Sequence, residues 1–194
     1  MAKRTQSDKI TLGSGKIYIL EYNSDAGMPE IDEFCNEENI LGKTKGGAQL
    51  NYNTEHHAEA DDLGTVEKDV ITAESATMKL GLITFNGNTL AKLADRCQVT
   101  ENKEKGIRTV KIGGAGNAQG KQWAFCFAHE DKVDGNIWVR VRGSNQAGLA
   151  LAFATDAGSK LEPEIKALPC DDGGTLIFYD EEIDKTASTN GTSS

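Results

Sequence analysis

The sequence predicts a mainly β protein: an antiparallel β-sandwich or barrel with one flanking α-helix and a long projecting loop. Three observations support this fold class. Many short runs alternate apolar and polar residues, which is the two-residue period of a strand with one buried face. Glycine, asparagine and aspartate separate these runs and favour turns. One segment alone has helical spacing, so the whole pattern is typical of an antiparallel sandwich or barrel.

The stretch 40–85 contains the clearest strand pattern and also its longest interruption. Residues 48–53 alternate strictly, and residues 77–85 place three apolar side chains on one side, Met78, Leu80 and Leu82. The segment 54–72 between them is rich in charge, too polar to form a core and long for a hairpin turn. We therefore expect a long loop at 54–72 that projects and becomes ordered against another molecule. The alternative is a solvated surface loop.

Further strands are expected in short segments that share apolar character or alternation: 9–22, 107–112, 121–129, 137–142, 148–155, 160–168 and 175–179. The first is interrupted by a glycine-rich break at 13–15. Residues 23–39 predict a loop with one helical turn after Pro29, and residues 101–106 predict a polar turn. The Asp-Gly-Asn sequence at 134–136 predicts a hairpin turn between two of the strands.

One helix is expected, at residues 89–98. Asn88 can cap it by accepting a hydrogen bond from a backbone N–H group. Apolar residues then recur at helical spacing on one face: Leu90, Leu93, Ala94 and Cys97. A helix of about ten residues is marginal by itself, so we expect it to pack on a sheet.

The length of 194 residues predicts a single domain, residues 1–194. A polar N-terminal arm is expected at 1–8 and a flexible Ser/Thr-rich tail at 184–194. The apolar fraction of 38% is modest, and 21 glycines accompany it. We expect a glycine-rich, loop-rich domain with a thin core.

The charge balance limits the possible partners. A net charge of −9 and a pI near 4.9 argue against a protein that grips nucleic acid, because phosphate binding needs a basic face. No apolar run approaches the roughly 20 residues of a membrane span, and residues 1–8 lack the apolar section of a secretory signal. The sequence therefore predicts a soluble chain made in a cytoplasm.

The cysteines and histidines do not form a recognisable metal site. Cys35, Cys97, Cys126 and Cys170 contain no closely spaced pair, so we expect reduced, buried thiols and no structural zinc. The adjacent histidines at 56–57 point to opposite faces of an extended chain and make a poor first shell for a metal. We expect no metal and no cofactor.

No arrangement of residues predicts catalysis. The segment 113–120 is rich in glycine but lacks the spacing of a phosphate-binding loop, and a strand follows it rather than a helix. His129 has no serine or cysteine in a nucleophile-type turn near it. The pair at 171–172 lacks calcium-loop spacing. We expect that the protein is not an enzyme.

Three stretches nevertheless resemble a known family. They are Gly-Ser-Gly-Lys-Ile-Tyr-Ile at 13–19, Ile-Leu-Gly-Lys-Thr-Lys-Gly-Gly-Ala-Gln-Leu-Asn-Tyr at 40–52, and Ala-Leu-Pro-Cys-Asp-Asp-Gly-Gly-Thr-Leu-Ile-Phe-Tyr at 167–179. With the acidic segment and the helix between them, these stretches follow in an order that resembles the major tail tube protein of tailed bacteriophages of the long-tailed, siphophage-like kind. The resemblance covers most of the chain, but the segment 113–120 and the Ser/Thr tail have no place in it.

The resemblance implies a structural virion protein. Members of the family fold as a β-sandwich with a flanking helix, assemble by themselves into hexameric rings, and stack these rings into a hollow tail tube for genome delivery. The implied partners are further copies of the chain, the tape measure protein, and the tail terminator and distal tail proteins. DNA passes through the lumen without specific binding. The implied location is the virion tail, after assembly in the host bacterial cytoplasm.

The resemblance also implies a role for the charged segment. It would contact the adjacent ring, and the candidate inter-ring residues are Glu55, His56, His57, Glu59, Asp61, Asp62 and Glu67. An alternative function is a β-sandwich recognition module that binds a carbohydrate or a receptor at a virion or cell surface. That function needs an exposed aromatic platform, for which the sequence offers Trp123, Trp138 and a few tyrosines.

Overall fold

The computed structural model describes residues 13–60, 62, 65, 67–132, 134–151, 159–171 and 173–183. The chain is mainly β with antiparallel sheets and one longer helix, as the sequence predicts. Its elements are β1 (Lys16–Glu21), α1 (Ile31–Phe34), the 3₁₀ turn η2 (Glu37–Asn39), β2 (Ile40–Ala60), β3 (Glu67–Leu82), α2 (Gly87–Leu93), β4 (Cys97–Asn102), β5 (Ile107–Ile112), the 3₁₀ turn η3 (Ala115–Asn117), β6 (Trp123–His129), β7 (Ile137–Asn145), β8 (Glu164–Ala167) and β9 (Phe178–Glu181). The predicted arm at 1–8 and tail at 184–194 lie outside the described residues.

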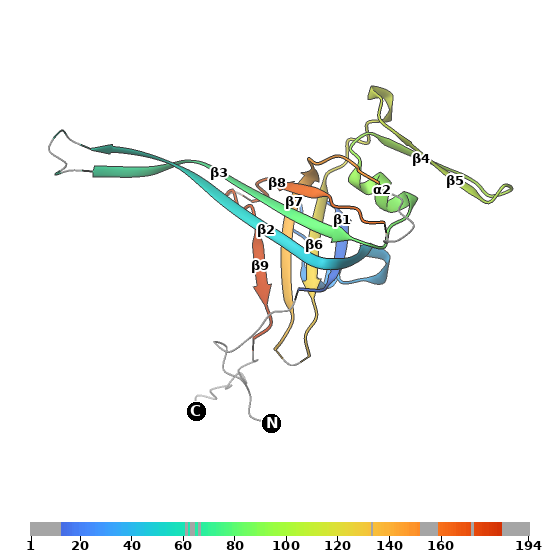
Figure 1. Ribbon diagram of the computed structural model, residues 1–194, viewed down its shortest axis with the longest axis horizontal. Helices are drawn as coiled ribbons and strands as arrows, with labels where there is room; N and C mark the ends of the chain where they lie inside the picture. Colours follow the sequence, from blue (N-terminus) through green and yellow to red (C-terminus); the bar gives the residue numbers. More distant parts are fainter. Residues whose placement is uncertain are drawn as a thin grey trace, which may run out of the picture.

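Antiparallel strands close into a barrel at the centre of the molecule (Figure 1). Their order is β6, β1, β2, β3, β8 and β7, and β7 returns to pair with β6. The opposite edge of β7 is shared, since residues 143–145 pair with β8 and residues 137–140 pair with β9. Strand β9 therefore extends the sheet beyond the closed ring.

The main core fills the interior of this barrel. Ile17 and Ile19 of β1 pack there with Phe125 of the neighbouring strand β6, Val141 of β7 and Ile165 of β8. Each of these side chains is at most 1% exposed. Burial of apolar surface in this cluster is the main driving force for closing the barrel.

The outer face of β1 and β6 is buried as well. Tyr18 and Cys126 belong to a second apolar cluster that also contains Phe34 of α1. Helix α1 is the single helical turn predicted after Pro29, and that prediction is confirmed. Burial on both faces explains why β6 is apolar at almost every position instead of alternating.

Helix α2 is shorter than predicted, and a different residue caps it. The side-chain oxygen of Asn86, not Asn88, accepts hydrogen bonds from the backbone N–H groups of Asn88 and Thr89 at 2.9 and 3.2 Å. The helix ends at Leu93, and Cys97 begins β4. The apolar spacing that predicted a longer helix therefore combines helical residues with the first residue of a strand.

Several strand boundaries also differ from the prediction. Strand β4 overlaps the predicted polar turn at 101–106, and the turn itself is confined to residues 103–106. Residues 148–151 are not a strand, and the rest of the segment predicted at 148–155 lies outside the described residues. Strand β8 lies within the segment predicted at 160–168 but is shorter, and β9 overlaps the segment predicted at 175–179 only at residues 178–179.

All four cysteines are free thiols. Cys97, Cys126 and Cys170 are buried, as expected, whereas Cys35 is exposed. The prediction of burial is wrong for Cys35 because this residue follows the last turn of α1, outside the apolar face that Phe34 presents to the second cluster.

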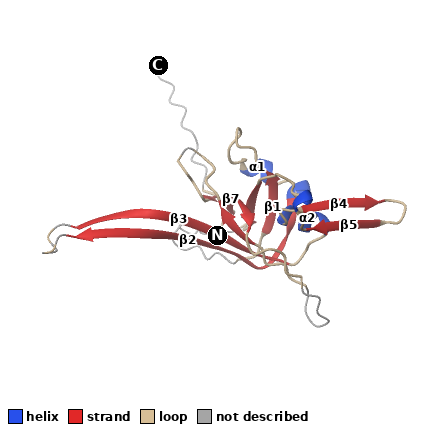
Figure 2. Cartoon of the chain, turned by 90° about the horizontal axis from the view of Figure 1, so that it is seen from above, coloured by secondary structure: helices blue, strands red, loops and turns tan. Residues whose placement is uncertain are grey.

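Two β-hairpins project from the barrel in opposite directions, as Figures 1 and 2 both show. One is the outer part of β2 and β3, and the other is β4 with β5. We call residues 52–60 and 67–76 the ribbon, because they lie beyond the short contact of β3 with β8 at residues 77–79. We call residues 96–112 the short hairpin.

The ribbon corrects the prediction of a long loop at 54–72. Residues 54–60 belong to β2 and residues 67–72 belong to β3, with paired positions from Thr54↔Glu74 out to Ala60↔Glu67. The segment is polar because solvent surrounds both faces, yet each strand satisfies the backbone hydrogen bonds of the other. Polarity alone therefore indicated a loop where the chain forms an exposed hairpin.

Candidate assembly surfaces

A glycine pair lies in the barrel part of β2, ahead of the ribbon. Gly46 and Gly47 have φ values of 89° and 75°, a region that side chains disfavour, and the strand register shifts between Thr44 and Ala48. Gly47 also lies against the backbone, since a Cβ atom there would meet the carbonyl oxygen of Gly13 at 2.1 Å. The two glycines let one continuous strand serve first the barrel and then the ribbon.

One face of the ribbon continues the interior face of the barrel. Residues paired across an antiparallel ladder lie on the same face, and the register pairs Leu50 with Met78 and Tyr52 with Ala76. Met78 and Ala76 are buried in the core, whereas Leu50 is 38% and Tyr52 is 53% exposed. An apolar face thus runs out of the core and into solvent.

A β-bulge interrupts this face half-way along the ribbon. The register shifts between Glu55 and His56, so Thr72 becomes the extra residue, and its hydroxyl donates to the backbone carbonyl of Glu55 at 3.2 Å. Beyond the bulge, β3 presents Ile71 on the same face as His56. Ile71 is 52% exposed, and so the exposed apolar face extends past the bulge.

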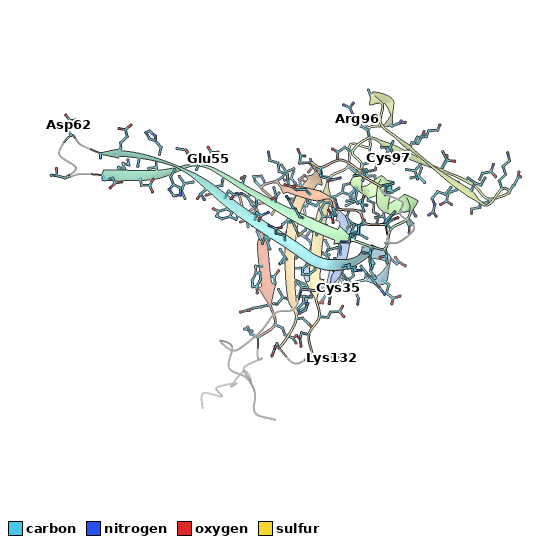
Figure 3. All side chains as sticks on the ribbon, in the orientation of Figure 1. Cys35, Glu55, Asp62, Arg96, Cys97 and Lys132 are labelled. Carbon is cyan, nitrogen blue, oxygen red and sulfur yellow. The ribbon has the colours of Figure 1, made fainter. Side chains whose placement is uncertain are left out.

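The predicted contact residues cluster on the outer half of the ribbon. Glu55, His56, His57, Glu59 and Glu67 all lie on its two strands and are exposed. Asp62 lies in the connecting turn, and Figure 3 shows it near the far end of the ribbon with Glu55 closer to the barrel. Asp61 lies outside the described residues.

The two adjacent histidines point to opposite faces, as predicted. Nδ1 of His56 lies 2.9 Å from a carboxylate oxygen of Asp69, while Nε2 of His57 lies 3.0 Å from Glu59. Among the described residues, no group of three or more His, Cys, Asp or Glu side chains is arranged to hold a metal ion. Their neighbours are carboxylates, so the histidines offer the ribbon two exposed ion pairs when protonated.

The ribbon is strongly acidic. Residues 52–76 contain seven Asp and Glu residues against one Lys. Desolvation and the carboxylate of Glu74 raise the pKa of the Tyr52 hydroxyl, so that group stays protonated beside the carboxylate. The ribbon therefore presents negative charge along a surface that also exposes apolar side chains.

The short hairpin is a second projecting surface; its strand β5 confirms the strand predicted at 107–112, whereas β4 was not predicted. Residues 96–112 contain five Lys and Arg against two Glu, the opposite of the ribbon. Arg108 and Glu101 form an ion pair at 2.7 Å, while Ile107 and Ile112 are 56% and 52% exposed. The alternation that begins at Cys97 indicated strand β4, but Cys97 was assigned to the helix predicted at 89–98.

Strand β9 provides a third open surface. In the described part of the chain, β9 pairs with β7 alone, so its other edge carries unpaired backbone groups. Tyr179 on this strand and Ile183 just after it are 58% and 62% exposed. An open edge of this kind can accept a further strand from another molecule.

Comparisons with known proteins give the chain no family. No protein-family model matches it, and a search of curated proteins found no similar sequence. Every helix in the described ranges is too short or too polar to cross a membrane. The candidate function therefore depends on the surfaces themselves and on the sequence resemblance given above.

Proposed function

We propose that the chain is a structural subunit that assembles with copies of itself into hexameric rings, which stack as the hollow tail tube of a long-tailed bacteriophage. DNA passes through the lumen of such a tube. The observation that carries the proposal is the ribbon, whose apolar face is continuous with the core but exposed in the single chain.

An isolated two-stranded ribbon of this length is a poor structure for a monomer. Two-stranded hairpins are marginally stable in water without a third strand or a packed face. Leu50, Tyr52 and Ile71 together leave apolar surface in solvent, and burial is worth about 25 cal/mol per Å². Covering this face with a neighbouring subunit supplies what the monomer lacks.

The open strand edges support self-assembly in the same way. Three elements have a strand edge that pairs with no further strand among those described. They are the ribbon, the short hairpin and β9. Soluble monomers usually block such edges. In a closed ring of six copies one edge of each subunit can pair with a different edge of the next, and the same contact repeats around the ring by symmetry.

The acidic composition suits a conduit for DNA. A net charge of −9 repels phosphate groups, so DNA would slide along an acidic wall without sticking. Screening limits this repulsion to about 8 Å at physiological ionic strength, which confines the effect to the wall.

Electron microscopy of the purified full-length chain tests the proposal. We expect rings and uniform hollow tubes at high protein concentration. A variant whose ribbon residues 54–74 are replaced by an Asn-Gly turn serves as the control, because the turn then joins the paired residues Asn53 and Ser75, keeps the barrel and removes the outer part of the ribbon. The proposal is wrong if the full-length chain sediments as a monomer at every concentration and forms no tubes.

The alternative of a carbohydrate or receptor module has weaker support. Both tryptophans of the chain pack against core clusters, Trp123 against the barrel interior and Trp138 against the second cluster. Tyr52 and Tyr179 are the exposed aromatic residues among those described, and they lie on different elements. A stable monomer that binds a glycan array would favour the alternative.

A further inference from the structure

We infer that the acidic ribbon of one copy docks on the basic short hairpin of a second copy, and that this contact joins one ring to the next. The inference rests on the proposed function and names the partner surface of the ribbon. Charge, direction and exposed apolar side chains support it independently.

The charges of the two surfaces are complementary. Residues 52–76 carry seven acidic residues and one Lys, whereas residues 96–112 carry five basic residues and two Glu. On the short hairpin, Lys103, Lys105 and Lys111 are all exposed. Complementary potentials speed encounter and fix the register of an interface, while like charges exclude a wrong partner. Two ribbons repel each other, and so do two short hairpins.

The directions of the two arms require a second copy. The ribbon and the short hairpin extend from opposite sides of the barrel in both views (Figures 1 and 2). Within one chain the two surfaces therefore cannot meet. An acidic arm on one side and a basic arm on the other give a head-to-tail contact, which either closes into a ring or continues as an open stack. We assign it to the open stack of rings.

Both surfaces also carry apolar side chains that such a contact would cover. On the ribbon, Val70 pairs with His57, lies on the same face as Glu55 and Glu59, and is 42% exposed. On the short hairpin, Ile107 is 56% exposed. Interface cores are depleted of charge and surrounded by a polar rim. The exposed apolar residues among the charges of both arms fit that composition.

Charge reversal with reciprocal rescue tests the inference. One variant carries Glu55→Lys, Glu59→Lys, Glu67→Lys and Glu74→Lys, which leaves three acidic residues and five Lys at 52–76. A second carries Lys103→Glu, Lys105→Glu and Lys111→Glu, which leaves two basic residues and five Glu at 96–112. We expect either variant alone to lose tubes in electron microscopy while keeping single rings. An equal mixture of the two should recover tubes of alternating subunits, because each reversed arm meets a reversed partner. The control Asp25→Lys, Glu37→Lys, Glu38→Lys, Glu162→Lys changes net charge by the same amount as the ribbon variant at exposed positions off both arms, and should keep its tubes.

A second readout identifies the contact directly. A carbodiimide joins a carboxylate to a lysine amine without a spacer, and mass spectrometry of wild-type tubes should find ribbon carboxylates joined to Lys103, Lys105 or Lys111. A mixture of ¹⁵N-labelled and unlabelled chains should give half of these links as mixed pairs.

The possible failures are distinguishable. Tubes from both reversed variants, or a folded pair that does not rescue, overturn the inference but leave the proposed function in place. A wild-type chain that forms neither rings nor tubes overturns the proposed function and the inference with it. Misfolding cannot produce the expected recovery of tubes, because two misfolded chains cannot rescue each other.

Discussion

At the scale of single residues, Arg140 joins three parts of the chain. Its guanidinium donates to Asp180 of β9 at 2.8 and 3.2 Å and to the carbonyl of Pro29 at 2.7 Å. Arg140 is 7% exposed, so its loss leaves a carboxylate and a carbonyl without their partner. We expect Arg140→Ala to lower the free energy of unfolding by about 2 kcal/mol. This loss is smaller than for a fully buried ion pair, because solvent reaches the partly exposed Asp180. Urea unfolding measures this.

The control for that variant is an ion pair of similar length on the surface. Lys16 and Glu130 lie 2.8 Å apart with side chains 38% and 56% exposed. Exposed pairs contribute about 0–1 kcal/mol, so Lys16→Ala should have little effect. If Arg140→Ala and Lys16→Ala lower the free energy of unfolding equally, the structural role of Arg140 is contradicted.

The buried thiols predict how stability depends on alkaline pH. Burial raises the pKa of the Cys97, Cys126 and Cys170 thiols. Above the ordinary thiol pKa of about 8.5, the unfolded chain loses protons that the folded chain keeps. Since the folded state then binds more protons, the free energy of unfolding falls as pH rises. Urea unfolding in reductant at pH 7, 9 and 10 should show this decline.

A substitution of one buried thiol checks that prediction. Cys126→Ala removes one group that titrates on unfolding, so its stability should fall less steeply, by about 1.4 kcal/mol per pH unit above the ordinary thiol pKa. The substitution also lowers stability by a constant amount through lost packing. Parallel curves for the variant and the wild type would show that Cys126 is not responsible.

At the scale of elements, the sequence predicted the strands that alternate and the single turn α1, and it missed features that depend on distant partners. The pairing of β1 with β6 joins residues far apart in the sequence, whose register no local pattern contains. By contrast, the hairpin turn predicted at 134–136 does lie between two paired strands, β6 and β7. Strand β4 was hidden because Cys97 continued an apparent helical spacing. The ribbon was predicted as a loop because its polarity resembles that of a loop, although β-branched residues at 70–72 indicated strand character.

The ribbon should gain protection from hydrogen exchange when the chain assembles. In the single chain, residues 53–60 and 67–75 belong to a two-stranded element exposed on both faces, so their amides open easily. We expect fast exchange there in monomers and slow exchange in tubes, measured by mass spectrometry. Residues 124–128 of β6 are buried and serve as the reference, with slow exchange in both states. Equal exchange of the ribbon in both states would contradict its role in assembly.

At the scale of the whole molecule, two electrostatic effects oppose each other. The net charge of −9 makes any two copies repel at long range. The acidic ribbon and the basic short hairpin attract at short range. Which effect dominates depends on the ionic strength, because salt screens distant charges before it screens charges in contact.

The rate of tube assembly should therefore pass through a maximum as salt rises. The screening length falls from about 30 Å at 0.01 M salt to about 10 Å at 0.1 M and about 3 Å at 1 M. The first decrease removes repulsion between whole molecules and speeds assembly. The second decrease weakens the contact between the ribbon and the short hairpin, and therefore slows assembly. Light scattering over this range measures the rate, and a variant with Glu55→Gln, Glu59→Gln and Glu67→Gln should keep the rise but lose much of the fall. A rate that increases steadily to 1 M salt in the wild type would mean that apolar contacts, not charge pairing, join the rings.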